Sequence, residues 1–122
     1  MMKIKKILAA VLAAAMLLLC FVGCGKKDAT DLDYVKENGT LLVGITEFEP
    51  MDYKAADGNW IGFDADMAKA FAESLGVKAE FVIIDWDNKI MELNNKSIDC
   101  VWNGMTLTDE VKSSMECSTP YC

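Results

Sequence analysis

Leu41-Leu42-Val43-Gly44-Ile45 is a continuous run of apolar residues. A strand with one solvated face alternates polar and apolar residues, whereas an unbroken apolar run indicates a strand that is buried on both faces. Strands of this kind are typical of parallel sheets that helices cover on both sides. The run therefore predicts one strand of a parallel, helix-covered sheet.

Helical patterns flank this run. Before it, residues 32–38 predict a short helix that Asp31 can cap, and Gly39 follows where a left-handed residue ends many helices. After it, the sequence predicts a longer helix that Asp64 can cap and that ends at Gly76. The residues expected on the inner side of this longer helix are Met67, Ala70, Phe71, Ser74 and Leu75.

Two further strand patterns follow, over residues 79–84 and 98–102, with a helix predicted between them. Asp85 or Asp87 can cap this helix. Its expected inward residues are Ile90, Met91 and Leu93. The order strand, helix, strand, helix, strand predicts an α/β fold, in which right-handed crossovers build a parallel sheet with flanking helices.

The first 23 residues have the pattern of a secretory signal peptide. Three Lys residues precede an uncharged apolar run over residues 7–22, and the small residue Gly23 comes directly before Cys24. A transmembrane anchor is the alternative, because the run approaches the ~20 residues needed to span a bilayer. The Gly-Cys junction favours the signal peptide.

Residues 21–24, Phe-Val-Gly-Cys, resemble the bacterial lipoprotein signal, which is cut before a cysteine whose sulfur carries a diacylglycerol. Phe departs from the Leu that is usual at the first of these positions. The resemblance implies that residues 1–23, the signal-peptide helix, are removed and that Cys24 anchors the protein to membrane lipid. Residues 24–31 would form a tether. The domain over residues 32–122 would lie outside the cytoplasm, in the periplasm or on the outer face of the cell membrane.

The composition excludes several classes of function. Three of the 12 Lys lie in residues 1–23, which hold no acid, so the rest of the chain has nine Lys against 19 Asp and Glu, a net charge of −10. Such a surface repels nucleic acid. The chain has no His and no Arg, so the commonest general base and metal ligand is absent. We therefore expect no catalytic residues, no metal and no cofactor.

Three cysteines follow Cys24, namely Cys100, Cys117 and Cys122. Export permits a disulfide, and Cys100 with Cys117 is the first candidate pair. Two buried thiols are an equally good interpretation, because both positions resemble core positions. Cys117 with Cys122 is the alternative pair, which would close a tight loop.

The loops that follow the three predicted strands are the expected place for chemistry. In open parallel sheets, ligands bind outside the carboxyl ends of the strands. These loops cover residues 46–51, 85–87 and 103–108, and each holds hydrogen-bonding groups. Two of them also hold an aromatic residue, Phe48 or Trp86. Together they predict a small polar pocket with apolar walls.

Five short stretches follow one another along the chain: Gly39-Thr40-Leu41-Leu42-Val43-Gly44, Glu49-Pro50-Met51, Trp60-Ile61-Gly62-Phe63-Asp64-Ala65-Asp66-Met67, Ile98-Asp99 and Asn103-Gly104-Met105-Thr106-Leu107-Thr108-Asp109-Glu110. In this order and spacing they resemble family 3 of the bacterial extracellular solute-binding proteins. The resemblance covers residues 32–121. The stretch that begins at Gly62 and the one that begins at Gly104 are together its most specific part.

The resemblance implies a type II periplasmic-binding-protein-like fold of two lobes that close on a polar amino acid or a related small solute. Residues 32–122 would be an incomplete first lobe. The implied function is that of the substrate-binding component of an ABC importer, which delivers its solute to the membrane permease subunits. A sensory receptor domain and an exported dehydratase of the same fold are the alternatives.

The resemblance also implies roles for particular residues. Phe48 and Trp86 would flank the side chain of the ligand. Gly104 and Thr106, with Met105 between them, would bind its amino and carboxylate groups. The carboxylate of Glu47 can meet a ligand's ammonium group, although a solvated carboxylate is the simpler interpretation in an acidic chain.

Val111 stands where the family usually has an Arg that binds the ligand's α-carboxylate. Two interpretations stay open. Either Thr106, Lys112 and backbone N–H groups near the helix that Thr108 caps hold the carboxylate, or the ligand has no α-carboxylate.

Overall fold

The computed structural model describes residues 29–122. The expected signal peptide, the acylation site Cys24 and most of the expected tether lie outside the described residues. Within residues 29–122, no helix is long and apolar enough to span a membrane.

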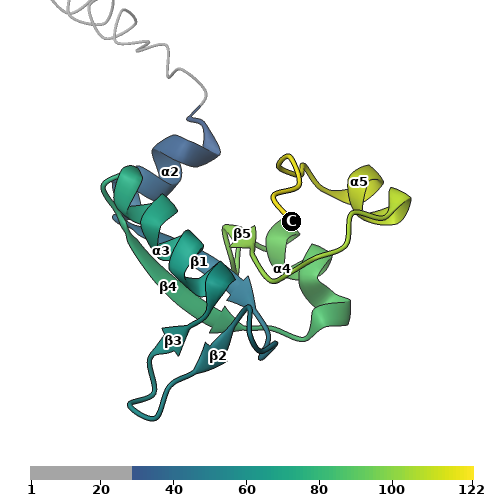
Figure 1. The fold of residues 1–122 in the computed structure, drawn as a ribbon. Helices are drawn as coiled ribbons and strands as arrows, with labels where there is room; N and C mark the ends of the chain where they lie inside the picture. The colour runs from purple at the N-terminus through teal and green to yellow at the C-terminus, as the bar shows by residue number, and fades with distance from the viewer. Residues whose placement is uncertain (1–28) are drawn as a thin grey trace, which may run out of the picture.

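A parallel sheet of three strands forms the centre of the fold (Figure 1). The strands are β1 (Thr40–Ile45), β4 (Lys78–Ile83) and β5 (Cys100–Val101), in the order β4-β1-β5. β1 pairs with β4 over its whole length, from Thr40 opposite Lys78 to Ile45 opposite Ile83. The predicted α/β fold with a parallel sheet is therefore confirmed, with the apolar run as its middle strand.

The helix α2 (Asp31–Asn38) begins one residue earlier than predicted. Its cap is Thr30, not Asp31: the Thr30 hydroxyl accepts from the Asp33 N–H, and the Asp33 carboxylate accepts from the Thr30 N–H at 3.0 Å. This reciprocal pair satisfies two free donors of the first turn, which Asp31 cannot do from inside the helix. Gly39 ends the helix with φ 71°, as predicted.

The helix α3 (Phe63–Ser74) packs on the sheet with a face that the sequence did not indicate. Its buried apolar residues are Ala65, Ala68 and Ala72, whereas Phe71 is 45% exposed and lies against the Trp102 ring with centroids 5.6 Å apart. Short side chains allow the helix to approach β1 and β4 closely, so the larger residues are displaced to its flanks. The predicted inner face was therefore wrong for Ala70, Phe71 and Ser74, which are exposed.

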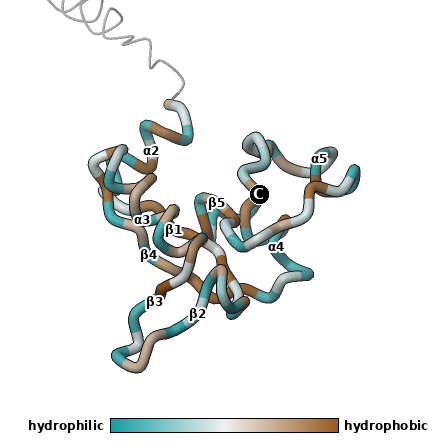
Figure 2. The backbone as a smooth tube through the Cα atoms, viewed as in Figure 1, coloured by the Kyte–Doolittle hydropathy of each residue, from teal (hydrophilic) through white to brown (hydrophobic). Residues whose placement is uncertain are grey.

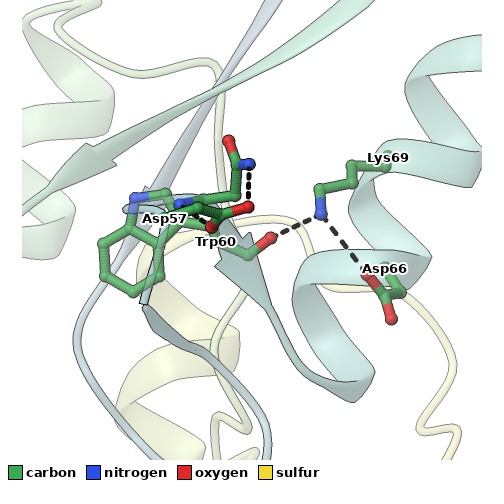
Figure 3. Close-up of polar contacts among 5 residues, drawn as sticks. Asp57, Trp60, Asp66 and Lys69 are labelled. Carbon is green, nitrogen blue, oxygen red and sulfur yellow. Dashed lines mark hydrogen bonds and ion pairs between the residues drawn. The ribbon is translucent and has the colours of Figure 1, made fainter. Parts of the chain in front are cut away.

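A small hairpin of β2 (Tyr53–Lys54) and β3 (Trp60–Ile61), absent from the prediction, joins β1 to α3. Figure 3 shows how Lys69 of α3 secures it: the Lys69 ammonium donates to the Trp60 carbonyl and lies 3.4 Å from the Asp66 carboxylate. At the hairpin tip, the Asp57 side chain accepts from the N–H groups of Asn59. These contacts are exposed, so each adds little stability on its own.

The main hydrophobic core lies between β1 and the helices α2 and α3. Figure 2 shows hydrophobic residues along β1, in the middle of the fold. The buried members of this core are Val35, Leu41, Val43, Ile45, Ala68 and Ala72. Gly44 lies on the other face of β1, beside Ile84 and Ile98, which are also buried. Both faces of the middle strand are therefore covered.

The remaining elements lie beyond β5 (Figure 1). They are the 3₁₀ helix η1 (Trp86–Asn88), α4 (Lys89–Asn94) and α5 (Asp109–Ser114). Asp85 caps η1 by accepting from the Asp87 N–H at 3.1 Å, which agrees with one of the two predicted caps. Met91 was expected to point inward but is 51% exposed, because this short element presents Ile90 and Leu93 to the fold instead.

Candidate functional site

A cavity of about 460 Å³ opens at the carboxyl ends of β1, β4 and β5. Loops that are far apart in the sequence meet there, as expected for a parallel sheet. Its lining residues are Thr46, Phe48, Trp86, Lys89, Ile90, Asn103, Gly104, Met105, Thr106, Thr108, Glu110 and Val111. The volume lies in the range of small-molecule sites.

Asn103 joins the loop after β1 to the loop after β5. Its side chain is 7% exposed, donates to the Thr46 hydroxyl at 2.6 Å and accepts from the Thr46 N–H at 3.3 Å. Both hydrogen-bonding ends of the amide are thus satisfied. The pair fixes the floor of the cavity, and the Asn103 amide is engaged within the protein.

Gly104 lies against the ring of Phe48. It adopts φ 48°, and a Cβ at this position would lie 3.0 Å from Phe48 Cε1. The Gly104 N–H donates to the Asp64 carboxylate at 2.6 Å. This leaves the carbonyl oxygen as the backbone group of Gly104 that is available to a ligand.

Asp64 binds the loop that contains Gly104 through a hydrogen bond. It is 0% exposed and accepts both from the Gly104 N–H and, at 2.6 Å, from the Tyr121 hydroxyl. The prediction that Asp64 caps α3 was wrong: Gly62 occupies the cap position, and the Asp64 side chain makes no capping hydrogen bond. Its partners lie 40 and 57 residues away in the sequence, so no local pattern indicates them.

Asp52 lies near Asp64 and is also 0% exposed. Among the described residues, neither of its carboxylate oxygens has a hydrogen-bond partner. Burial, and secondarily the charge of Asp64, raise the pKa of Asp52 to about 7. The segment between β1 and β2 therefore contains a carboxyl group whose pKa is raised well above its ordinary value.

Trp86 and Lys89 form one wall of the cavity. Trp86 begins η1, and Lys89 begins α4. The Lys89 ammonium lies 4.8 Å from the centroid of the Trp86 ring and donates to the Trp86 carbonyl at 3.1 Å. A cation over an indole ring is an attractive arrangement, so this contact holds the Lys89 side chain beside the cavity.

Another part of the lining comes from the start of α5. The Thr108 hydroxyl caps this helix by accepting from the Val111 N–H at 3.2 Å. Val111 lines the cavity and is 7% exposed, and Glu110 lines it beside Val111. The position where the family resemblance leads us to expect an Arg therefore contributes an apolar side chain to this part of the lining.

The structure brings five of the residues expected at a ligand site to this cavity: Phe48, Trp86, Gly104, Met105 and Thr106. Glu47 and Lys112 are exposed and do not line it. Lys112 differs in this from its neighbours Glu110 and Val111, which both line the cavity.

The sequence interpretation missed Lys89 and Glu110 as lining residues. A signal for Lys89 was present, because it stands three residues after Trp86, and side chains three apart on a helix are neighbours. Glu110 had no comparable signal, since an acidic residue in the first turn of a helix is already explained by the helix dipole.

Cys100, Cys117 and Cys122, all within the described residues, are free thiols. The structure therefore does not form the Cys100–Cys117 disulfide or its alternative. Burial, with a smaller effect of the Asp99 charge, raises the pKa of Cys100 to about 12. Cys117 donates to the Met115 carbonyl at 3.5 Å. Over residues 29–122, no group of three or more acidic or thiol side chains is arranged to hold a metal ion.

The model of the family described as bacterial extracellular solute-binding proteins, family 3, matches residues 41–122. The L-cystine-binding protein TcyJ of Escherichia coli (strain K12) is 41% identical over 91 residues, which is 74% of this chain and 34% of that protein. The cyclohexadienyl dehydratase of Pseudomonas aeruginosa is 34% identical over 74% of this chain and 34% of its own length.

Among solved structures, the arginine-bound form of domain 1 from TmArgBP is similar in fold and sequence. The TM-score is 0.69 and the identity 41%, over 73% of this chain and 71% of that domain. The chain spans about a third of the length of the two curated relatives. The similarity therefore covers one domain of such proteins.

Proposed function

Because this chain belongs to family 3 of the bacterial extracellular solute-binding proteins, we propose that it forms the first lobe of the substrate-binding component of an ABC importer. This component captures a polar amino acid or a related small solute outside the cytoplasmic membrane. It delivers the solute to the membrane permease subunits. In this function the protein binds its solute and releases it unchanged.

The observation that carries the proposal is the cavity, which Phe48, Trp86 and Thr106 all line. Two aromatic side chains provide apolar contact area for a ligand's side chain, and the hydroxyl and backbone groups of the Thr106 loop can bind its polar groups. A second lobe beyond this chain would close over the cavity. The relatives named above for L-cystine and arginine support an amino acid as the ligand.

The dehydratase among the relatives makes an enzyme the second candidate. The ionisable side chains that line the cavity are Lys89 and Glu110, and the chain has no His to shuttle a proton. Incubation with the ligand separates the two functions. A binding protein returns its ligand unchanged, whereas conversion of the ligand at a measurable rate would favour the enzyme.

We expect an amino acid to raise the melting temperature of the full-length protein. A ligand at ~100 times its dissociation constant adds about 2.7 kcal/mol to the free energy of unfolding. Trp86→Ala should remove most of this shift because it removes one of the two aromatic side chains that line the cavity. Asp57→Ala, at the exposed hairpin tip, is the control and should leave the shift unchanged.

The measurement is a thermal-shift screen of the standard amino acids and L-cystine, on protein that was unfolded and refolded to remove bound ligand. No shift with any of them would contradict the proposed function. An equal loss in the Trp86→Ala and Asp57→Ala proteins would contradict the proposed site.

We also propose that Cys24 is acylated after removal of residues 1–23, which anchors the protein to the membrane. The Lys-rich start, the apolar run and Gly23 support this. Radiolabelled palmitate should enter the wild-type protein and be absent from a Cys24→Ser variant. Two or more acyl chains hold a protein stably on a membrane, so acylation of Cys24 is sufficient to keep the domain at the membrane surface. Label that persists in the variant would refute the assignment.

A further inference from the structure

The cavity is lined by one cationic and one anionic side chain, Lys89 and Glu110. We propose that Lys89 binds a carboxylate group of the ligand and so selects solutes that carry one. This inference rests on the proposed function, because it concerns the ligand of the same cavity. It assigns to α4 a role that the family resemblance places on α5.

The position of Lys89 is fixed before a ligand arrives. Its ammonium group is held by the Trp86 carbonyl at 3.1 Å and by the Trp86 ring, 4.8 Å from its centroid. An ammonium group has three N–H donors, and among the described residues one protein acceptor is engaged. Two donors are therefore left for a ligand, on a side chain whose conformational freedom is already reduced.

The part of the lining that α5 contributes contains no cation for a ligand carboxylate. Val111 is apolar, and the neighbouring Glu110 carries a negative charge into the lining. Lys112, the other candidate cation, is exposed and does not line the cavity. A ligand carboxylate is therefore repelled from α5 and attracted to α4.

The same two charges predict an orientation for an amino acid. Its carboxylate would lie towards Lys89 and its ammonium group towards Glu110, with its side chain between Phe48 and Trp86. Lys binds a carboxylate as a point charge and not through the two parallel hydrogen bonds of Arg. We expect its contribution to affinity to be roughly tenfold to a hundredfold.

The test is titration calorimetry on the full-length protein with each standard L-amino acid and L-cystine, and with the α-carboxamide of each amino acid that binds. A carboxamide keeps the shape of the acid but has no negative charge. The wild type should bind the acid at least tenfold more tightly than the carboxamide. Lys89→Met should weaken binding of the acid tenfold to a hundredfold and change binding of the carboxamide less than threefold.

Two further variants complete the test. Lys89→Arg should retain most of the preference for the acid, and Lys112→Met is the matched control and should behave as the wild type. Circular dichroism verifies folding, and Lys89→Gln replaces Lys89→Met if the latter does not fold.

The outcomes separate this inference from the proposed function. If the wild type binds an amino acid and Lys89→Met retains the full preference for the acid, Lys89 does not bind the carboxylate, although the proposed function stands. Equal weakening of acid and carboxamide would mean that Lys89 only supports Trp86, which also overturns the inference. If the wild type binds no amino acid, both fail.

Discussion

Gly62→Ala is expected to lower the free energy of unfolding of this protein by about 3 kcal/mol or more, the sum of a strained backbone and an overpacked contact. Gly62 adopts φ 119°, a region that L side chains rarely enter. A Cβ at this position would overlap the Met51 carbonyl and lie 2.8 Å from the Pro50 oxygen. These are backbone atoms, so no side-chain rotation relieves the overlap.

The contact matters because it joins the loop after β1 to the start of α3. The N–H groups of Phe63 and Asp64 donate to the carbonyls of Pro50 and Met51 at 3.2 and 2.9 Å. A shift of Gly62 away from Met51 would lengthen these hydrogen bonds and displace the loop that carries Phe48. We therefore expect ligand affinity to fall together with stability.

Urea denaturation followed by circular dichroism measures this effect. Gly58→Ala is the matched control, because Gly58 also has a positive φ, 83°, but nothing lies within 4 Å of its added Cβ. The control isolates the backbone cost, which is about 1 kcal/mol or slightly more. Similar losses for the two variants would show that the overlap with Met51 is relieved at little cost.

Raising the pH from about 4 to about 7 is expected to destabilise the wild-type protein through Asp52. Its pKa is raised from 3.8 to about 7 in the folded state, mainly by burial. In this window the unfolded chain has lost the proton and the folded protein retains it, so each rise in pH favours unfolding. Since one pKa unit corresponds to about 1.4 kcal/mol, the loss is on the order of 4 kcal/mol, and it levels off above pH 7.

Asp52→Asn should remove this dependence, because an amide has no proton to lose between pH 4 and 7. The measurement is the free energy of unfolding in urea at several pH values across the window. Asp57→Asn is the control: hydrogen bonds from Asn59 lower the pKa of Asp57, so its contribution is lost only as the pH falls below about 4. An unchanged slope in the Asp52→Asn protein would show that Asp52 is ionised in the fold.

The amino-acid sequence by itself was enough to predict the class of fold and the edge of the sheet at which the cavity lies. The apolar run at Leu41 predicts a doubly covered strand because burial on two faces requires apolar residues at every position. Gly39 marks a helix end because it adopts a left-handed conformation at little cost. Phe48, Trp86 and Thr106 were predicted together because the carboxyl ends of parallel strands always meet at one edge of a sheet.

Only the tertiary structure decided the roles that depend on distant partners. Asp64 has the position of a helix cap in the sequence, yet it holds Gly104 and Tyr121, which lie 40 and 57 residues away. The face of α3 that packs on the sheet is made of Ala residues, because the separation of helix and sheet sets the size of the side chains between them. Lys89 lines the cavity and Lys112 does not, because the packing of each helix against the fold sets the direction of its side chains. A local sequence pattern shows which residues of a helix share a face, but not which way the rest of the fold orients that face.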